Sequence, residues 1–248
     1  MKPQAEIGRL ILSLVVIVGA AELTTGAVAK STPQSASSIK RMPLRSTNVA
    51  VPDGHPQIVV RIHNYAHVDT GLLLGAEAVA TVILREAKVD VRWVYCPLPQ
   101  EEYDRYPECP TAWGPDAFVL NILTPQMTAR IQTRVENLGS APTPCDDNAT
   151  SCPISVFYFR VVERAEHFGI QPVRLLGHVL AHEVGHTLGA HHSARGIMRG
   201  EWGRDELKLM GFSILEFSTD EANQLRATVI QRARQQELVQ DLKLSASR

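Results

Sequence analysis

The feature that most constrains this chain is the run HEVGHTLGAHH, from His182 to His192. His182 and His186 are spaced so that on a helix they share one face and lie about one turn apart. Glu183 follows the first histidine and can act there as a general base toward a metal-bound water. Gly189 can end the helix in a left-handed conformation that residues with a Cβ adopt poorly, which lets the chain bring His192 back to the same metal. Three imidazoles leave the fourth position of a tetrahedral zinc ion open for water, as in catalytic zinc sites.

Two other ligand sets fit the spacing less well. His191 competes with His192 for the third position, but the place of the preceding glycine favours His192. A downstream carboxylate, with Asp205 as the candidate, is the second alternative. Such an acid needs a helix to carry it, and the glycines between positions 196 and 203 argue against a helix there. His178 lies one turn before the first ligand, where we expect a partly exposed polar side chain.

The pattern HExxHxxGxxH resembles the zinc signature of the metzincin metallopeptidases. That clan has a methionine turn beneath the zinc, for which Met198, shortly after His192, is the candidate. Ser193 is similar to the matrixin branch of the clan. The sequence departs from that branch at Arg199 and Gly200, where matrixins usually have an aromatic residue and a proline.

The resemblance is tight over residues 180–198 and looser elsewhere. It implies an exported endopeptidase with one catalytic zinc ion, Zn²⁺, held by His182, His186 and His192. Such an enzyme hydrolyses peptide bonds through a zinc-activated water, with Glu183 as general base. The implied partner is a peptide or protein substrate. An exported zinc-binding interaction module without catalysis is the alternative, but a zinc site of that kind needs no glutamate beside its first ligand.

Hydrophobic periodicity predicts alternating strands and helices, and therefore an α/β (α+β) fold. The predicted strands are 58–64, 89–95, 118–123 and 154–162. The predicted helices are 72–87, 173–187 and 219–240, and residues 190–217 are expected to be irregular. With the resemblance, these elements indicate a metzincin-like catalytic domain over residues 57–242. It would contain a mixed twisted sheet, a zinc-site helix, a methionine turn and a C-terminal helix.

The N-terminal residues 1–29 are typical of a secretory signal peptide. A basic flank precedes an apolar run from Leu10 to Ala21, which is short for a membrane span. Ala27-Val28-Ala29 is typical of a cleavage site, and an earlier cut after Ala21 or an uncleaved membrane anchor are the alternatives. Residues 30–56 are rich in Ser, Pro and Thr and are predicted to be a linker or a disordered mature N-terminus. We therefore expect a secreted or periplasmic protein without stable membrane association after signal cleavage.

Four cysteines occur in the chain, and an even number in an exported protein indicates two disulfide bonds. Three connectivities satisfy this number. Pairing between sequence neighbours, Cys96 with Cys109 and Cys145 with Cys152, would staple two loops. None of the four lies near the histidine motif, so none is assigned as a zinc ligand.

Composition narrows the choice of partner. The formal net charge of −1 over 248 residues gives no electrostatic case for nucleic acid or an anionic membrane.

A peptide substrate can bind in extended form along an exposed sheet edge. Residues 118–123 and 154–160 are the two candidate edge strands, and the sequence does not choose between them. The candidate residues for a specificity pocket follow the methionine turn: Leu207, Leu209, Met210 and Phe212. The oligomeric state is not predicted.

Overall fold

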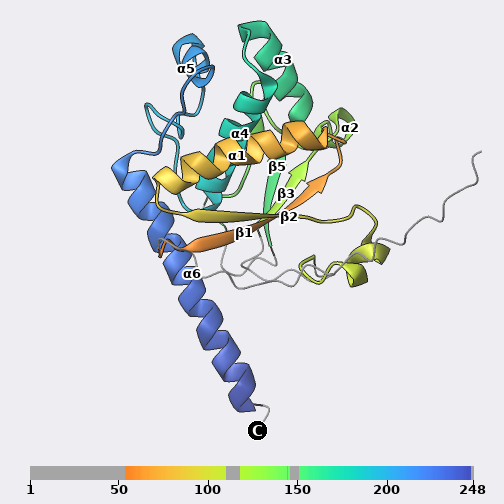
Figure 1. The fold of residues 1–248 in the computed structure, drawn as a ribbon, viewed down its shortest axis with the longest axis vertical. Coiled ribbons are helices and arrows are strands. Elements are labelled where there is room, and N and C mark those ends of the chain that lie inside the picture. The colour runs from red at the N-terminus through yellow and green to blue at the C-terminus, as the bar shows by residue number, and fades with distance from the viewer. Residues whose placement is uncertain (1–53, 110–117, 144, 146–150, 247–248) are drawn as a thin grey trace, which may run out of the picture. The chain divides into compact units, whose positions relative to one another are not determined.

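The computed structural model describes residues 54–109, 118–143, 145 and 151–246 (Figure 1). The predicted signal peptide, residues 1–29, lies outside the described residues. So does the predicted linker, residues 30–56, apart from its last three positions. The domain organisation predicted for this part of the chain stays a prediction.

A mixed five-stranded sheet with the order β2-β1-β3-β5-β4 forms the centre of the fold. The strands are β1 (Gln57–Asn64), β2 (Asp90–Tyr95), β3 (Phe118–Ile122), β4 (Gly139–Ser140) and β5 (Cys152–Val156). β1, β2, β3 and β5 run parallel, and β4 pairs with β5 in the antiparallel direction. The α/β fold and the mixed sheet predicted from the sequence are confirmed.

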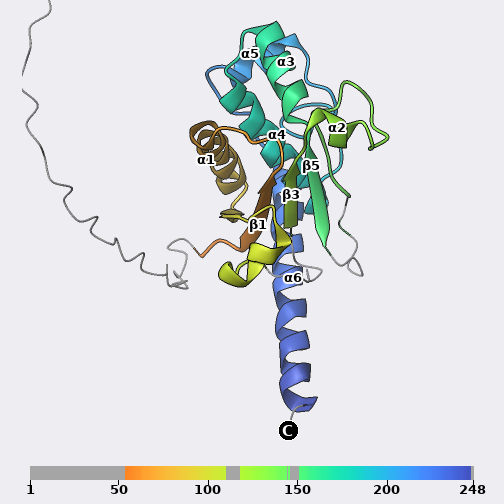
Figure 2. The ribbon, with the colours of Figure 1, turned by 90° about the vertical axis from the view of Figure 1, so that its right-hand side faces the viewer.

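Helices α1 (Thr70–Glu86) and α4 (Pro172–Thr187) pack against each other and supply most of the helical part of the core. α1 connects the parallel strands β1 and β2, and the Asp69 side chain caps its N-terminus by accepting from Leu72 N at 3.0 Å. Alternate residues of β1, namely Ile58, Val60 and Ile62, are buried in the same core. Figures 1 and 2 show α1 and α4 toward the upper side of the sheet.

Two segments differ from the sequence expectation. The predicted strand 154–162 ends at Val156 and continues as helix α3 (Tyr158–Phe168), whose buried residues Val161 and Ala165 recur at helical spacing. The predicted irregular stretch 190–217 contains a short helix, α5 (Arg204–Met210). The side chain of Glu206 accepts from Gly203 N at 2.9 Å and so satisfies a backbone donor at the start of α5. Two further short elements, η1 (Gln100–Arg105) and α2 (Pro125–Thr128), lie in loops.

The prediction that residues 118–123 or 154–160 form an edge strand of the sheet is wrong. β3 lies between β1 and β5, and β5 lies between β3 and β4, so neither is at an edge. The edges of the sheet are β2 and the two-residue strand β4. β4 escapes a pattern-based prediction because it is too short to show an alternation of apolar and polar residues.

The long helix α6 (Thr219–Ala246) passes the left-hand end of the sheet in Figure 1, and its C-terminal part extends away from the sheet in both views. The helix begins with a capping box, in which Ser218 N donates to Glu221 Oε2 at 2.7 Å and Glu221 N donates to Ser218 Oγ at 3.3 Å. Further along, the buried Arg232 donates to Cys145 O at 3.0 Å. This bond fixes α6 to the loop before β5.

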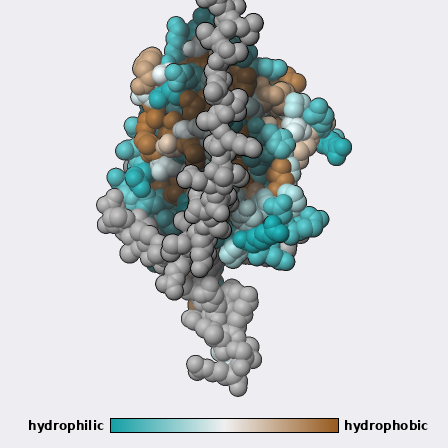
Figure 3. All heavy atoms as spheres, turned by 45° about the vertical axis from the view of Figure 1, so that its right-hand side comes forward, coloured by the Kyte–Doolittle hydropathy of each residue, from teal (hydrophilic) through white to brown (hydrophobic). Residues whose placement is uncertain are grey.

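The cysteines pair as sequence neighbours, Cys96 with Cys109 and Cys145 with Cys152. The first disulfide belongs to a small second core with Val94, and the second joins the loop after β4 to the start of β5. On the face drawn in Figure 3, hydrophobic residues appear among hydrophilic ones at the surface. Among the described helices, none combines the length and the apolar character needed to cross a membrane.

Candidate metal centre

Helix α4 carries the first part of the motif through the core. All its residues from Leu175 to Thr187 are buried, and Gly189, at φ +91°, follows its end. Ala190 N donates to Gly185 O at 3.0 Å and Gly189 N donates to His186 O at 2.9 Å, which together form a Schellman motif. The left-handed helix end predicted at Gly189 is confirmed. It reverses the chain so that the residues after it return toward α4.

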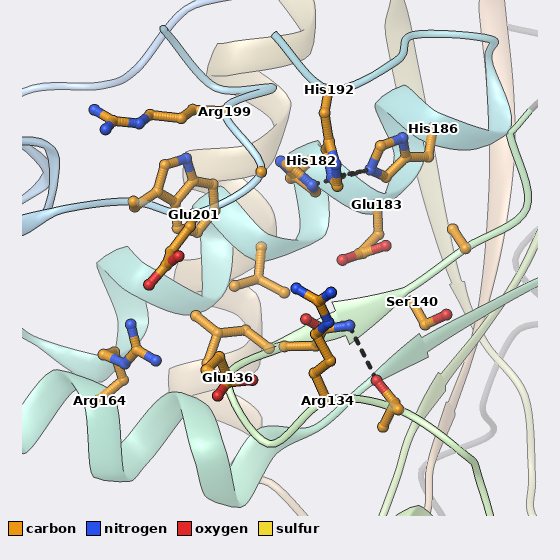
Figure 4. Close-up of a pocket in the computed structure, with 18 of the residues that line it drawn as sticks. Arg134, Glu136, Ser140, Arg164, His182, Glu183, His186, His192, Arg199 and Glu201 are labelled. Atoms are coloured by element: carbon orange, nitrogen blue, oxygen red, sulfur yellow. Dashed lines mark hydrogen bonds between the residues drawn. The ribbon is translucent and has the colours of Figure 1, made fainter. Parts of the chain in front are cut away.

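His182, His186 and His192 meet at one point, and they are the group of described residues that can hold a metal ion (Figure 4). Nε2 of His186 lies 3.0 Å from Nε2 of His182 and 3.1 Å from Nε2 of His192. Nitrogen ligands about 2.0–2.1 Å from a tetrahedral zinc ion stand about 3.4 Å apart. The spacing of the three imidazoles is therefore close to that of a zinc site.

Backbone carbonyls fix which nitrogen of each buried ring carries the proton. His182 Nδ1 donates to Ile197 O at 2.7 Å, and His186 Nδ1 donates to Ala190 O at 2.8 Å. Because a carbonyl oxygen can only accept, the Nε2 atoms of the two neutral rings present lone pairs to each other. Burial lowers the pKa of His182 to about 3 and lowers the pKa of His186, which favours the neutral rings. Facing lone pairs need a cation between them, so the donor set fits Zn²⁺.

The carboxylate of Glu183 lies beside the three histidines in Figure 4. The residue is only 5% exposed, and its Oε2 has no hydrogen-bond partner among the described residues. Burial raises the pKa of Glu183 to about 8. A cation at the histidine cluster would stabilise the ionised carboxylate and oppose this shift. A buried carboxylate without a partner is the second observation that fits a metal ion here.

The predicted methionine turn is a tight turn under the C-terminal part of α4. Ser193 N donates to Met198 O at 2.9 Å, and Gly196 adopts φ +76°. Met198 is fully buried, and its sulfur lies 2.8 Å from the position that a Cβ on Gly185 would take. Gly185 therefore lets the methionine pack directly against the zinc-site helix. The role of Met198 in supporting a metal site stays a prediction.

Trp202 is a neighbour of the site that sequence reasoning missed. Its Nε1 donates to Ile197 O at 3.2 Å, the same carbonyl that accepts from His182 Nδ1. The rings of Trp202 and His182 meet edge to face with centroids 5.3 Å apart. Trp202 thus helps to fix the carbonyl that orients the first histidine. The only indication of this role in the sequence was that Trp202 follows Met198 closely.

His178 is fully buried, so the expectation of a partly exposed side chain was wrong. Its Nδ1 donates to Arg174 O at 2.7 Å, and its Nε2 accepts from Leu215 N at 3.1 Å. The histidine therefore ties the segment after α5 to α4. The contact between His178 and Leu215 was not predictable from the sequence, because the two residues lie far apart in the chain. The methionine turn and α5 place Leu215 next to α4.

This contact gives a pH-dependent prediction. Burial lowers the pKa of His178 to about 4, whereas an unfolded histidine titrates near 6.5. As pH falls from about 6.5 to about 4, the unfolded chain takes up a proton that the native chain does not, so stability falls by about 3 kcal/mol. The variant His178→Gln keeps an acceptor for Leu215 N but does not titrate. Urea unfolding across this range should show a steeper acid loss in the parent, and parallel curves would refute the assignment. The zinc ligands titrate in both proteins and cancel in the difference.

The three histidines and Glu183 open into a cleft of about 1160 Å³ (Figure 4). One wall is the segment 133–143, which includes β4, and the other is formed by residues 199–202. The charged residues that line the cleft carry both signs: Arg134, Glu136, Arg164, Arg199 and Glu201.

Of the four residues predicted for the specificity pocket, only Leu207 lines the cleft. Met210 is fully buried, Leu209 and Phe212 are exposed, and none of the three reaches the cleft.

The alternative ligand sets are not assembled. His191 is exposed and lines the cleft, but among the described residues it is His192 that joins the cluster. Asp205 is an exposed residue in the first turn of α5 and does not belong to the cluster either. A helix was not expected at this position, but α5 is present there. Its Glu206 forms an ion pair with Arg199.

No protein-family model matches this sequence, and no curated protein matches it. Among solved structures, the chain is similar to archaemetzincin from Methanopyrus kandleri, with a TM-score of 0.41 and 16% identity over 72% of this chain and 98% of that chain. It is also similar to a zinc-dependent peptidase from Methanocorpusculum labreanum, with a TM-score of 0.40 and 15% identity over 67% of this chain and 99% of that chain. Likenesses at this level carry no argument about function. The assignment to the matrixin branch stays a prediction from the sequence.

Proposed function

We propose that this chain is an exported zinc endopeptidase of the metzincin type. His182, His186 and His192 hold one zinc ion, and Glu183 is the general base. The observation that carries the proposal is the convergence of three Nε2 atoms beside a buried carboxylate. A zinc site that serves only structure is normally closed by a fourth protein ligand. The group of metal-binding side chains among the described residues has three members and opens into a cleft.

A bound Zn²⁺ supplies a Lewis acid that polarises a carbonyl oxygen and lowers the pKa of water. Glu183 accepts the proton of the attacking water and passes it to the nitrogen of the leaving amine. The carbonyls of Ile197 and Ala190 keep the Nδ1 atoms of His182 and His186 protonated, so both rings hold their Nε2 lone pairs toward the metal. The buried surroundings of Glu183 exclude bulk water from the carboxylate.

The substrate class that this cleft fits is an extended peptide. β4 is an edge strand of the sheet, and both of its residues line the cleft beside Glu183. An edge strand offers unpaired backbone N–H and C=O groups that an extended peptide can pair with.

Export is supported by the two disulfide bonds, since disulfides persist in oxidising compartments such as the periplasm or the extracellular space. The signal peptide assigned to residues 1–29 rests on the sequence pattern alone. A secreted or periplasmic location is therefore part of the proposal.

The test is a cleavage assay on unfolded casein with the mature protein, in which zinc content is measured on the same samples. We expect one zinc ion per chain and proteolysis that is lost when a chelator removes the zinc and regained when zinc is restored. A protein without bound zinc would contradict the proposal at its base. Bound zinc without cleavage of casein or of peptide libraries would instead favour a zinc-binding interaction module.

A further inference from the structure

The backbone of β4 and the side chain of Glu183 lie unusually close together. A Cβ placed on Gly139 would stand 2.5 Å from Glu183 Oε1, 2.7 Å from its Cδ and 2.7 Å from its Cγ. Real Cβ atoms essentially never come within 3.0 Å of such neighbours. The carboxyl group of Glu183 and the carbon before it therefore fill the space that any side chain at position 139 would need.

Neither backbone can move away easily. Gly139 is held on β5 by its pairing with Val156, and Phe157 N donates to Leu138 O at 2.9 Å just before it. On the other side, Glu183 is buried within α4, which packs against α1. The loop after β4 is also joined to the end of α4, because Cys145 N donates to Thr187 O at 3.5 Å. Relief of a clash at position 139 would therefore come from rotation of the Glu183 side chain.

Backbone conformation does not explain the glycine. The described glycines with positive φ are at positions 54, 169, 189 and 196, and Gly139 is not among them. An L-residue can adopt an ordinary strand conformation without strain. The cost of a side chain at position 139 is therefore steric and falls on Glu183.

We propose that Gly139 is a positioning residue for Glu183: the missing side chain on the edge strand leaves the space in which the carboxylate stays beside the three histidines. The catalytic consequence rests on the proposed function, but the steric relation does not. A general base must stay within hydrogen-bond reach of the proton that it removes, about 2.6–3.2 Å, and a misplacement of about 1 Å can cost on the order of 10²-fold in rate. The edge strand thus both borders the substrate and fixes the base.

The first test is a thermal-unfolding cycle on the zinc-loaded protein with Gly139→Ala, Glu183→Ala and the double variant. Overpacking against Glu183 predicts that Gly139→Ala lowers the Tm of the parent by about 3–8 °C. In the Glu183→Ala background the clashing atoms are gone, so the same substitution should leave the Tm unchanged or raise it. A Gly139→Ala protein that folds only in the Glu183→Ala background supports the proposal as well. An equal fall in both backgrounds would overturn it.

Gly71→Ala is the matched control. Gly71 is exposed in the first turn of α1, has no positive φ, and its Cβ would meet its nearest neighbour, Asp69 Oδ1, at 3.2 Å. The control should therefore change the Tm by the same small amount with and without Glu183. A coupling of Gly71→Ala to Glu183 as large as that of Gly139→Ala would contradict a local steric cause.

The second test is kinetic and uses a peptide that the parent cleaves. Gly139→Ala should bind zinc with the same stoichiometry and affinity, lower kcat by on the order of 10²-fold, and change KM by less than about threefold. A raised KM with unchanged kcat would overturn the positioning role and make position 139 a wall for the substrate. If the parent cleaves nothing, the proposed function fails, and the thermal cycle still decides whether Gly139 makes room for Glu183.

Discussion

The variant Glu183→Gln is expected to fold, to bind zinc as the parent does, and to cleave casein on the order of 10³-fold more slowly. The amide has nearly the shape of the carboxylate but cannot accept a proton, and proton transfer by a positioned side chain contributes typically 10²–10⁴-fold. Without zinc, the thermal stability of the variant should not fall, because burial raises the pKa of Glu183 to about 8 and an uncharged group suits that environment. Measurements of kcat/KM and zinc content on the zinc-loaded protein, and of Tm on the metal-free protein, check these expectations.

The matched control is Glu201→Gln, which removes another carboxylate from the wall of the cleft. Glu201 is exposed, so its replacement should change kcat/KM by less than about tenfold. If Glu183→Gln keeps most of the activity while Glu201→Gln loses it, the general base has been assigned to the wrong residue. If Glu183→Gln loses zinc together with activity, its defect says nothing about proton transfer and points to a part in metal binding.

Much of the candidate site was predictable because its determinants are local in the sequence. The spacing of His182 and His186 fixes their common face as soon as the segment is helical. Gly189 then specifies where that helix ends, because the helix terminates in a Schellman motif with a left-handed residue. The position of His192 follows from the same turn. The disulfides are local too, since each joins cysteines that are close in the sequence.

The parts of the site that were missed depend on contacts between distant segments. Gly139 meets Glu183, and His178 meets Leu215, only because the sheet and the methionine turn bring those segments to α4. A two-residue strand such as β4 has no periodicity of its own, and its pairing with β5 depends on the rest of the sheet. Sequence patterns report which face of an element is apolar, and they do not report which element covers it.

The misassigned segment 154–162 shows the same limit at the level of secondary structure. Its apolar and aromatic residues favour a strand, and the first half is one. The second half forms α3 because Val161 and Ala165 bury one helical face, while Arg160 Nη1 donates to Arg134 O and Asn137 O. Tertiary packing therefore overrides the local preference for a strand. The same hydrogen bonds hold the segment 133–143, which forms one wall of the cleft. Because α3 was predicted as a strand, this contact with the wall of the cleft was not predicted either.

The largest effect on metal binding is expected for His192→Ala. Structural zinc sites with four protein ligands bind the ion with about 10–16 kcal/mol, which is about 3–4 kcal/mol for each ligand. The loss of one imidazole should therefore cost about that much, or on the order of 10²–10³-fold in zinc affinity. Proteolysis should disappear at zinc concentrations that saturate the parent and should not return fully in excess zinc. His192 lies outside α4, so the metal-free fold should unfold at nearly the temperature of the metal-free parent. Zinc affinity by competition with a chelator and Tm without metal are the measurements.

Two controls separate His192 from the alternative ligands. His191→Ala removes the neighbouring imidazole, which is exposed and outside the cluster, and Asp205→Ala removes the acid in the first turn of α5. Both variants should keep the zinc affinity of the parent within about threefold, because neither group reaches the point where the three Nε2 atoms meet. A loss of zinc in Asp205→Ala with retention in His192→Ala would mean that α5 swings in to supply a carboxylate. The Schellman motif after α4 would then direct His192 toward the site without making it a ligand.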